Sequence, residues 1–560
     1  MKINYAGLGR EALERLRATK ENAKQVQKRI LFDLLERNKN TLYGKKYQFA
    51  EIKKIEEFQE KVPVSSYQNY EAHIKNVIEG EENVLTAEEP VYFCISSGTT
   101  GEAKYLPLTK TDLEIQYIYA YGIIYGMVME YYRELPEEEI FVPIFQIGEF
   151  ARTCMENGKM NGIRSGSLYQ WLDREGGFDA SDYCVPKEVL FPENLEDLLY
   201  VKVRFALARP GLRAIHGVFI NRVAGVMDYI YQNWDVLLRD MEQGSVDEKI
   251  DLADKWKSYI IQKLPPDPDR ARELRQLSFS NLRQGMIGKI WPKMKYVLAI
   301  GGGAFSYYTN KMKAYAGDIP IHYFAYAASE GIFGIARKIN EPDAYILFPE
   351  AGFFEFIPLS GKEGAGELKP KLLWQLQKGE KYELLFTNHS GLYRYRMKDV
   401  IEVVDWYGKA PVVKFCYRLN QMINIAGEKS NLEQLEEAVK CFEQKTGTVV
   451  KGYCVQEDVS GMLPGYLFYM ECRGEIGKRV EEILEDCLCS ANYEYKCCRK
   501  MREIAPLQIA FLREGSFKRY EQRISEKGKV TGQNKLLHFL DTEEKKQFFA
   551  SQRQVGKAWE

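Results

Sequence analysis

The stretch VYFCISSGTTGEAKYLPLT, residues 91–109, joins an apolar run to a loop of small residues and then to a second β-prone segment. The loop consists of hydroxyl residues and glycines: Ser96, Ser97, Gly98, Thr99, Thr100 and Gly101. Glycines let several N–H groups point into one concavity, and Lys104 adds a positive charge. The pattern indicates a site for an oxyanion, above all a polyphosphate, or else a plain hairpin turn. It matches neither a Walker loop nor the dinucleotide fingerprint.

Three later stretches contain residues suited to the rest of a nucleotide. IGGGAF, residues 300–305, is either a tight turn or a flat surface for a ring. YAASEG, residues 326–331, places Glu330 after an apolar strand, where it is either a surface glutamate or a ligand that shares Mg²⁺ with phosphate oxygens. LYRYRMKDV, residues 392–400, contains Asp399, which either accepts hydrogen bonds from a ribose diol or pairs with Arg394 or Arg396.

The chain around these motifs predicts an α/β fold with two domains. The first ninety residues favour charged helices, and from Val91 short β-prone runs alternate with helical stretches. A second, smaller pattern begins near Arg418, and its first helix carries a capping box of Ser430 and Glu433, with Gly447 near its end. We therefore expect a large N-terminal domain of mixed sheets and helices, residues 1–418, and a smaller, mobile C-terminal α+β domain, residues 419–560.

Composition argues against several classes of partner. The 560 residues carry a net charge of −1, from 78 basic and 79 acidic residues, so no strong field attracts nucleic acid or an anionic membrane. The eleven cysteines are scattered without CxxC spacing, as expected of reduced thiols in a cytoplasmic protein without structural metal. Residues 115–132 are apolar enough to suggest a membrane span, but their polar residues and a capping box of Thr111 and Glu114 favour a buried helix.

The order of these motifs resembles that of the adenylate-forming superfamily. In detail, the chain resembles the Gretchen Hagen family of auxin-responsive acyl acid amido synthetases. The resemblance rests on the stretch at residues 91–109, on NTLYGKKYQF at 40–49 and VPVSSYQNYEAHI at 62–74, and on the later motifs in their order. It covers most of the chain and weakens after about residue 430.

The resemblance implies roles for individual residues. The residues Ser96 to Gly101 and Lys104 are expected to bind the β- and γ-phosphates of ATP. Adenine is expected to lie between Tyr326 and the glycines Gly301, Gly302 and Gly303. Ser329 is expected to contact the α-phosphate, Glu330 to hold Mg²⁺ and Asp399 to bind the ribose. Arg418 is expected at the hinge, and Lys535 resembles the family's C-terminal lysine. The sequence departs from the family at Lys398, where glycine is usual, and at Leu536 and Leu537, which replace Pro-Arg.

The resemblance also implies an activity. It predicts an ATP-dependent ligase that activates a small carboxylic acid as an acyl-adenylate and transfers the acyl group to an amine, in particular an amino acid. The alternatives are an acyl-CoA synthetase and a non-catalytic nucleotide-binding regulatory protein. We expect a cytoplasmic monomer or weak oligomer. The residues Tyr117, Tyr121, Phe219 and Phe305 are candidates for an acyl pocket, although such residues are more often plain core.

Overall fold

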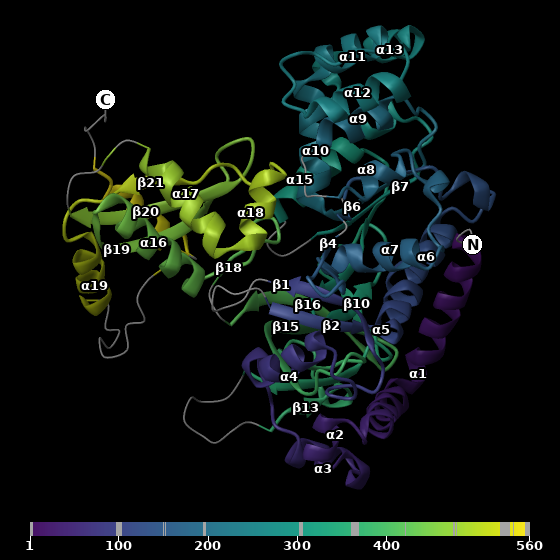
Figure 1. The fold of residues 1–560 in the computed structure, drawn as a ribbon, viewed down its shortest axis with the longest axis vertical. Helices are drawn as coiled ribbons and strands as arrows, with labels where there is room; N and C mark the ends of the chain where they lie inside the picture. The colour runs from purple at the N-terminus through teal and green to yellow at the C-terminus, as the bar shows by residue number, and fades with distance from the viewer. Residues whose placement is uncertain are drawn as a thin grey trace. The chain divides into compact units, whose positions relative to one another are not determined.

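The computed structural model describes residues 4–96, 104–148, 150–151, 153–193, 198–301, 306–359, 369–419, 422–473, 477, 479–526, 538–540 and 542–554. The described chain divides into two compact units (Figure 1). The first unit is formed by residues up to Ser96 together with Lys104–Leu419, and the second unit follows residue 419.

The helices of the first unit are α1 (Tyr5–Asn38), α2 (Leu42–Lys46), α3 (Ile55–Lys61), α4 (Tyr67–Glu79), α5 (Lys110–Ile115), α6 (Ile123–Tyr131), α7 (Arg164–Arg174), α8 (Lys187–Leu190), α9 (Leu199–Leu207), α10 (Ile220–Gln232), α11 (Trp234–Gln243), α12 (Asp254–Lys263), α13 (Pro268–Arg275), α14 (Met286–Ile290) and α15 (Ser306–Ala316). Short 3₁₀ turns occur at Phe49–Glu51, Glu137–Glu139, Ala180–Asp182, Phe279–Asn281 and Leu373–Gln375.

The long helix α1 packs against α6 through glycines. A β-carbon on Gly9 would lie 2.7 Å from the backbone nitrogen of Gly126, and one on Gly126 would lie 2.6 Å from the carbonyl oxygen of Gly9. Only residues without side chains permit this approach. A π-helical segment, Gln116–Gly122, joins α5 to α6, and most of this helical run is buried. The predicted buried helix at residues 115–132 is therefore confirmed.

The described residues of the first unit form three sheets. The first has the order β2 (Lys104–Thr109), β1 (Pro90–Ser96), β5 (Met160–Gly162) and β4 (Thr153–Cys154). The second, eight-stranded sheet has the order β13 (Lys371–Leu372), β12 (Phe353–Pro358), β14 (Lys381–Thr387), β15 (Tyr395–Tyr407), β16 (Ala410–Arg418), β11 (Tyr345–Leu347), β10 (Gly331–Ala336) and β9 (Ala325–Ala328). The third is parallel, with the order β3 (Ile144–Gln146), β6 (Ala214–Phe219), β7 (Tyr296–Ile300) and β8 (Ile321–Tyr323).

The second unit is an α+β unit around the sheet β19 (Val449–Asp458), β20 (Gly465–Arg473) and β21 (Gln508–Phe511). Successive side chains of β20 point to opposite faces of the sheet, as they do along any β-strand. Phe468 packs with α16 (Leu432–Thr446) and α17 (Val480–Ala491), whereas Leu467 packs toward α20 (Glu543–Ser551). The remaining elements are α18 (Tyr493–Lys500), α19 (Ser516–Glu526) and the short pair β17 (Met422–Ile423) and β18 (Ser430–Asn431).

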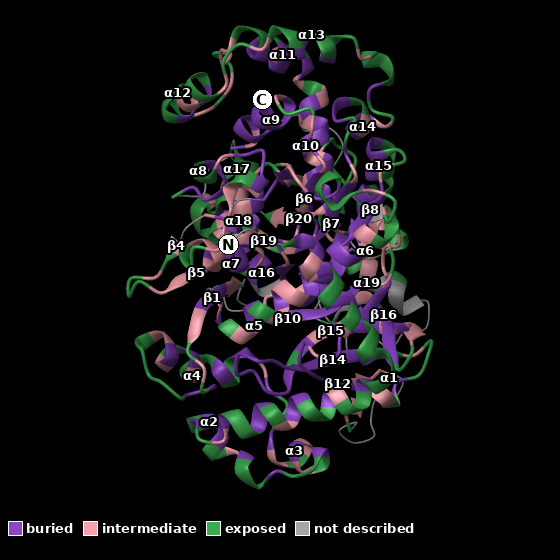
Figure 2. Ribbon diagram, turned by 90° about the vertical axis from the view of Figure 1, so that its right-hand side faces the viewer, coloured by how far each residue is buried: buried purple, intermediate pink, exposed green. Residues whose placement is uncertain are grey.

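The predicted α/β fold class is confirmed, and each of the two units buries its own apolar residues. Strands β14 and β15 lie in the buried interior of the first unit, whereas α2, α3, α12 and α13 present exposed faces (Figure 2). Most buried apolar residues of the first unit form one cluster, from Tyr5 to Val413. The second unit has its own clusters between Ile423 and Phe549.

Two predicted helix caps are wrong in register. The hydroxyl of Thr109, not Thr111, accepts the Asp112 amide at the start of α5. Asn431, not Ser430, caps α16, and its box partner is Gln434. The predicted end at Gly447 is confirmed, with a φ of 69°.

Candidate functional site

The predicted phosphate loop lies between two paired strands. Ser96 at the end of β1 is the register partner of Lys104 at the start of β2. The residues between them, which include Ser97, Gly98, Thr99, Thr100 and Gly101, lie outside the described residues, as do Gly302, Gly303, Phe305 and Lys535. The ammonium of Lys104 lies over the ring of Tyr67, 5.3 Å from its centroid. A positive charge is thus held at the β2 end of this loop.

Ser329 and Glu330 form the tip of the β9–β10 hairpin, because Ala328 and Gly331 are paired directly across it. The Glu330 side chain belongs to a residue with only 9% exposure. A β-carbon at residue 331 would lie 2.6 Å from the Phe386 ring, so the glycine lets the tip pack closely on that ring. The described residues contain no group of three or more His, Cys, Asp and Glu side chains arranged to hold a metal ion.

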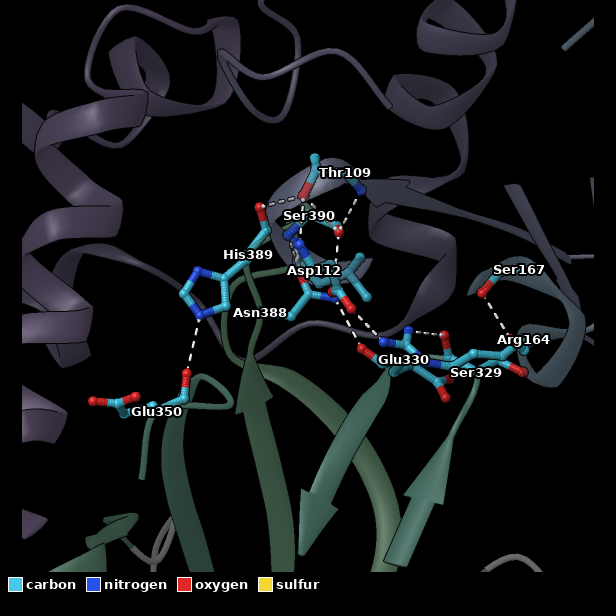
Figure 3. A network of polar contacts seen from close by, with 11 residues as sticks. Thr109, Asp112, Arg164, Ser167, Ser329, Glu330, Glu350, Asn388, His389 and Ser390 are labelled. Carbon is cyan, nitrogen blue, oxygen red and sulfur yellow. Dashed lines mark hydrogen bonds and ion pairs between the residues drawn. The ribbon is translucent and has the colours of Figure 1, made fainter. Parts of the chain in front are cut away.

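Side chains from distant elements surround this hairpin tip (Figure 3). Arg164, at the start of α7, donates to the carbonyl oxygen of Ser329 at 3.1 Å and forms an ion pair with Asp112 of α5. Asn388, after β14, donates to the carbonyl oxygen of Glu330 at 3.0 Å. Ser390 donates to the Asp112 carboxylate at 3.1 Å. The tip is therefore joined to α5, α7 and the β14–β15 connection.

The charges in this network act on one another. Burial acts to lower the pKa of Arg164, but Asp112, with Cys94 and Glu330, raises it overall. Burial raises the pKa of the Cys94 thiol to about 12, and Arg164 opposes that rise. Arg164 is thus a permanent cation in a buried site, and Asp112 is its bonded counter-charge.

Tyr326 and Asp399 are brought together by the fold. The Tyr326 hydroxyl donates to Oδ2 of Asp399 at 3.0 Å, and the two residues are 6% and 5% exposed. Asp399 is also the register partner of Arg418 across β15 and β16. Of the two arginines near Asp399 in the sequence, Arg394 donates to Glu355 and Arg396 donates to Glu383.

Gly301, at the carboxyl end of β7, has a packing reason to be glycine. A β-carbon there would lie 2.6 Å from the ring of Tyr323. Its carbonyl oxygen accepts a hydrogen bond from the Tyr345 hydroxyl at 2.9 Å. Among the acyl-pocket candidates that the structure describes, Tyr121 is buried in the main cluster, and Tyr117 and Phe219 pack against it.

Four residues of the network around the hairpin tip were not predicted from the sequence: Asp112, Arg164, Asn388 and Ser390. One local signal existed for Asn388, in the polar stretch TNHS after an apolar strand. Its Oδ1 accepts the backbone amides of Ser390 at 3.0 Å and Leu392 at 2.9 Å, which is the turn chemistry expected of asparagine. Arg164 and Asp112 offered no such signal.

Lys398, the residue that replaces the family's usual glycine, has a φ of 61°. A β-carbon costs about 1–2 kcal/mol in this left-handed region. We expect Lys398→Gly to have a free energy of unfolding about 1 kcal/mol higher than Lys398→Ala, the reverse of the usual ranking within strands. Urea unfolding of both variants measures the difference, and an alanine variant at least as stable as the glycine variant would contradict it.

The fold resembles that of a solved acyl acid amido synthetase. The solved structure titled "AtGH3.15 acyl acid amido synthetase in complex with 2,4-DB" has a TM-score of 0.64 with this chain at 21% identity, and the match covers 97% of this chain and 96% of that one. This likeness defines the class of fold. No described helix combines the length and apolar character needed to cross a membrane.

Three family models match successive parts of the sequence: the GH3 family N-terminal domain at residues 12–321, the GH3 family central domain at 345–418 and the GH3 family C-terminal domain at 433–544. The chain belongs to the GH3 family. A relative from Oryza sativa subsp. japonica, named "Probable indole-3-acetic acid-amido synthetase GH3.11", is 29% identical over 92% of this chain and 91% of its own. Another from the same organism, "Jasmonoyl--L-amino acid synthetase GH3.5", is 26% identical over 98% of both chains.

Proposed function

We propose that this protein is an ATP-dependent acyl acid amido synthetase. It activates a small carboxylic acid as an acyl-adenylate, releases pyrophosphate, and transfers the acyl group to the amine of an amino acid with release of AMP. The observation that carries the proposal is the pairing of Tyr326 with Asp399 in the unit that also holds the Ser329–Glu330 hairpin tip. Family membership supports the same activity, because one relative is named a probable indole-3-acetic acid-amido synthetase and the other a jasmonoyl–amino acid synthetase.

The chemistry needs no nucleophile from the protein. A carboxylate oxygen of the acid attacks the α-phosphorus, and the bond to pyrophosphate breaks. The amine nitrogen then attacks the acyl carbon, the bond to AMP breaks, and the amine loses a proton. The protein contributes position and charge, with Lys104 beside the predicted phosphate loop and Ser329 at the α-phosphate.

Glu330 fits a magnesium ion that is shared with the substrate. Mg²⁺ is commonly bound through one or two carboxylates and the phosphates of a nucleotide rather than by an all-protein cage. The single acidic residue at the largely buried hairpin tip agrees with that mode of binding. When bound, the ion would neutralise charge on the polyphosphate.

The second unit is proposed to act as a mobile lid that begins after Arg418. A closed lid would keep water from the acyl-adenylate and complete the site for the amine. We assign Arg418 to the hinge and Lys535 to the transferred group on the family resemblance. We propose a cytoplasmic location, because the scattered cysteines lack a disulfide framework in their spacing, and we propose a monomer or weak oligomer.

We expect Asp399→Ala to weaken ATP binding by about 1.5–3 kcal/mol, because hydrogen bonds between a charged group and the ribose hydroxyls are lost. Calorimetry with ATP and with 2′,3′-dideoxy-ATP tests the assignment. The unaltered protein should prefer ATP, and the alanine variant should lose that preference. Tyr326→Phe, which keeps the carboxylate, serves as the matched control and should retain the preference. An alanine variant that still prefers ATP would refute the ribose role.

The proposed activity is tested with a library of carboxylic acids screened for pyrophosphate release, with and without amino acids. Acid-dependent release, followed by an amide in the presence of an amino acid, supports the proposal. Transfer to coenzyme A and never to an amino acid would identify an acyl-CoA synthetase instead. A protein that binds ATP but releases no pyrophosphate with any acid would have a regulatory role.

A further inference from the structure

The backbone of Glu330 is held on both sides by side chains from other elements. The carbonyl of Ser329 belongs to the peptide unit before Glu330, and Arg164 donates to it at 3.1 Å. The carbonyl of Glu330 belongs to the peptide unit after it, and Asn388 donates to that one at 3.0 Å. Peptide units are planar, so the two rotations at residue 330 are the only freedom between them. Fixing both planes therefore fixes the direction in which the Glu330 side chain leaves the backbone.

Arg164 is itself fixed. Its Nη1 donates a hydrogen bond to the Ser329 carbonyl oxygen, and its Nη2 forms an ion pair with Asp112. The side chains of Arg164 and Asp112 are only 9% and 8% exposed. Asp112 also accepts from the Ser390 hydroxyl at 3.1 Å, and that hydroxyl oxygen accepts from the Thr109 amide at 3.1 Å. A buried ion pair of this kind does not shift easily, because movement would leave a charge unpaired. Figure 3 shows the chain of contacts from Thr109 to Ser329.

The geometry of arginine matters as well as its charge. Nη1 and Nη2 belong to one rigid, planar guanidinium, so the position of Asp112 determines where the donor to Ser329 lies. Lysine carries the same charge on a single nitrogen and cannot reproduce this fork. A substitution of Arg164 by lysine thus separates the effect of geometry from that of charge.

We propose that Arg164, fixed by Asp112, is a positioning residue that aims the Glu330 carboxylate at the Mg²⁺–ATP complex. The inference rests on the proposed function and adds to it a residue that does not contact the substrate. It predicts that Arg164 acts on Mg²⁺ binding through Glu330, so that its loss changes the Mg²⁺ dependence only while the Glu330 carboxylate is present.

The test is a double-mutant cycle of Arg164→Lys and Glu330→Gln, read out by calorimetric binding of ATP at a series of Mg²⁺ concentrations. Arg164→Lys should raise the Mg²⁺ concentration for half-maximal strengthening of ATP binding by roughly tenfold, since losing a group that orients a metal ligand costs about 10–100-fold in metal affinity. When Glu330 is already glutamine, Arg164→Lys should change this half-maximal Mg²⁺ concentration by less than about twofold, because the two residues act as one unit.

A matched control is Arg204→Lys. Arg204 is also a buried arginine, and it donates to the carbonyl oxygens of Ser245 at 2.8 Å and Asp240 at 3.0 Å, outside the network around the hairpin tip. Arg204→Lys should lower the melting temperature as Arg164→Lys does, and it should leave the Mg²⁺ dependence of ATP binding unchanged. Equal effects of Arg164→Lys in both backgrounds, or an unchanged Mg²⁺ dependence, would overturn the inference.

Failure of the inference and failure of the proposed function are distinguishable. Acid-dependent pyrophosphate release by the unaltered protein establishes the function independently of Arg164. If that release occurs and the cycle shows no coupling, the positioning role alone is wrong. If the unaltered protein shows no strengthening of ATP binding by Mg²⁺, both the assignment of Glu330 and the role of Arg164 are wrong.

Discussion

We expect Glu330→Gln to lower the rate of acid-dependent pyrophosphate exchange by roughly 10² or more, the effect of removing one group that stabilises charge in the transition state. The glutamine keeps the shape of the side chain and removes its charge. The hairpin tip should persist, because its packing on Phe386 and the contacts of Arg164 and Asn388 involve backbone and not the carboxylate. The loss therefore falls on the chemical step and on the use of Mg²⁺.

The measurement is isotope exchange between pyrophosphate and ATP over a range of Mg²⁺ concentrations. Glu341→Gln is the matched control, since it removes a carboxylate that pairs with Arg337 in the connection after β10. It should exchange at the normal rate. A normal rate for Glu330→Gln at saturating Mg²⁺ would show that this carboxylate does not hold the metal.

The strands around the site could be predicted because the sequence of each strand carries its own local pattern of apolar and β-branched residues. The β-prone runs expected after Val91 include YVLAI from residue 296, IHY from 321, FFEFIP from 353 and YELLFT from 382, and a strand forms at each of them. Glu330 could be noticed for the same reason, since it follows such a run directly. The helix caps were missed by one or two positions because threonine, serine and asparagine at neighbouring positions are all competent caps.

The network that holds the hairpin tip could not be predicted, because its contacts are distant in the chain. Arg164 and Ser329 are 165 positions apart, and Asp112 and Ser390 are 278 apart. A single arginine at the start of a helix is ordinarily a surface residue. Arg164 gains its buried partner Asp112 only because α5, α7 and the β14–β15 connection pack around the hairpin tip. The contact of Tyr326 with Asp399, 73 positions away, depends in the same way on the sheet order.

The last prediction separates the two units by ending the chain at Leu419. The buried cluster of the first unit extends from Tyr5 to Val413, so truncation removes none of its members. Leu419 itself is kept because its backbone amide donates to the carbonyl oxygen of Lys398 at 2.8 Å, next to Asp399. The shortened protein should fold, and it retains Lys104, Glu330 and Asp399.

We expect this shortened protein to bind ATP and to form no detectable amide. Without the second unit, water reaches the mixed anhydride and the site for the amine is incomplete. Acyl-AMP and amide are followed separately by mass spectrometry in single turnover, with the full chain as reference and thermal unfolding as the check on folding. Any acyl-adenylate that forms should decay to free acid and AMP. If the shortened protein makes amide at the rate of the full chain, the second unit takes no part in the transfer and the lid assignment is wrong.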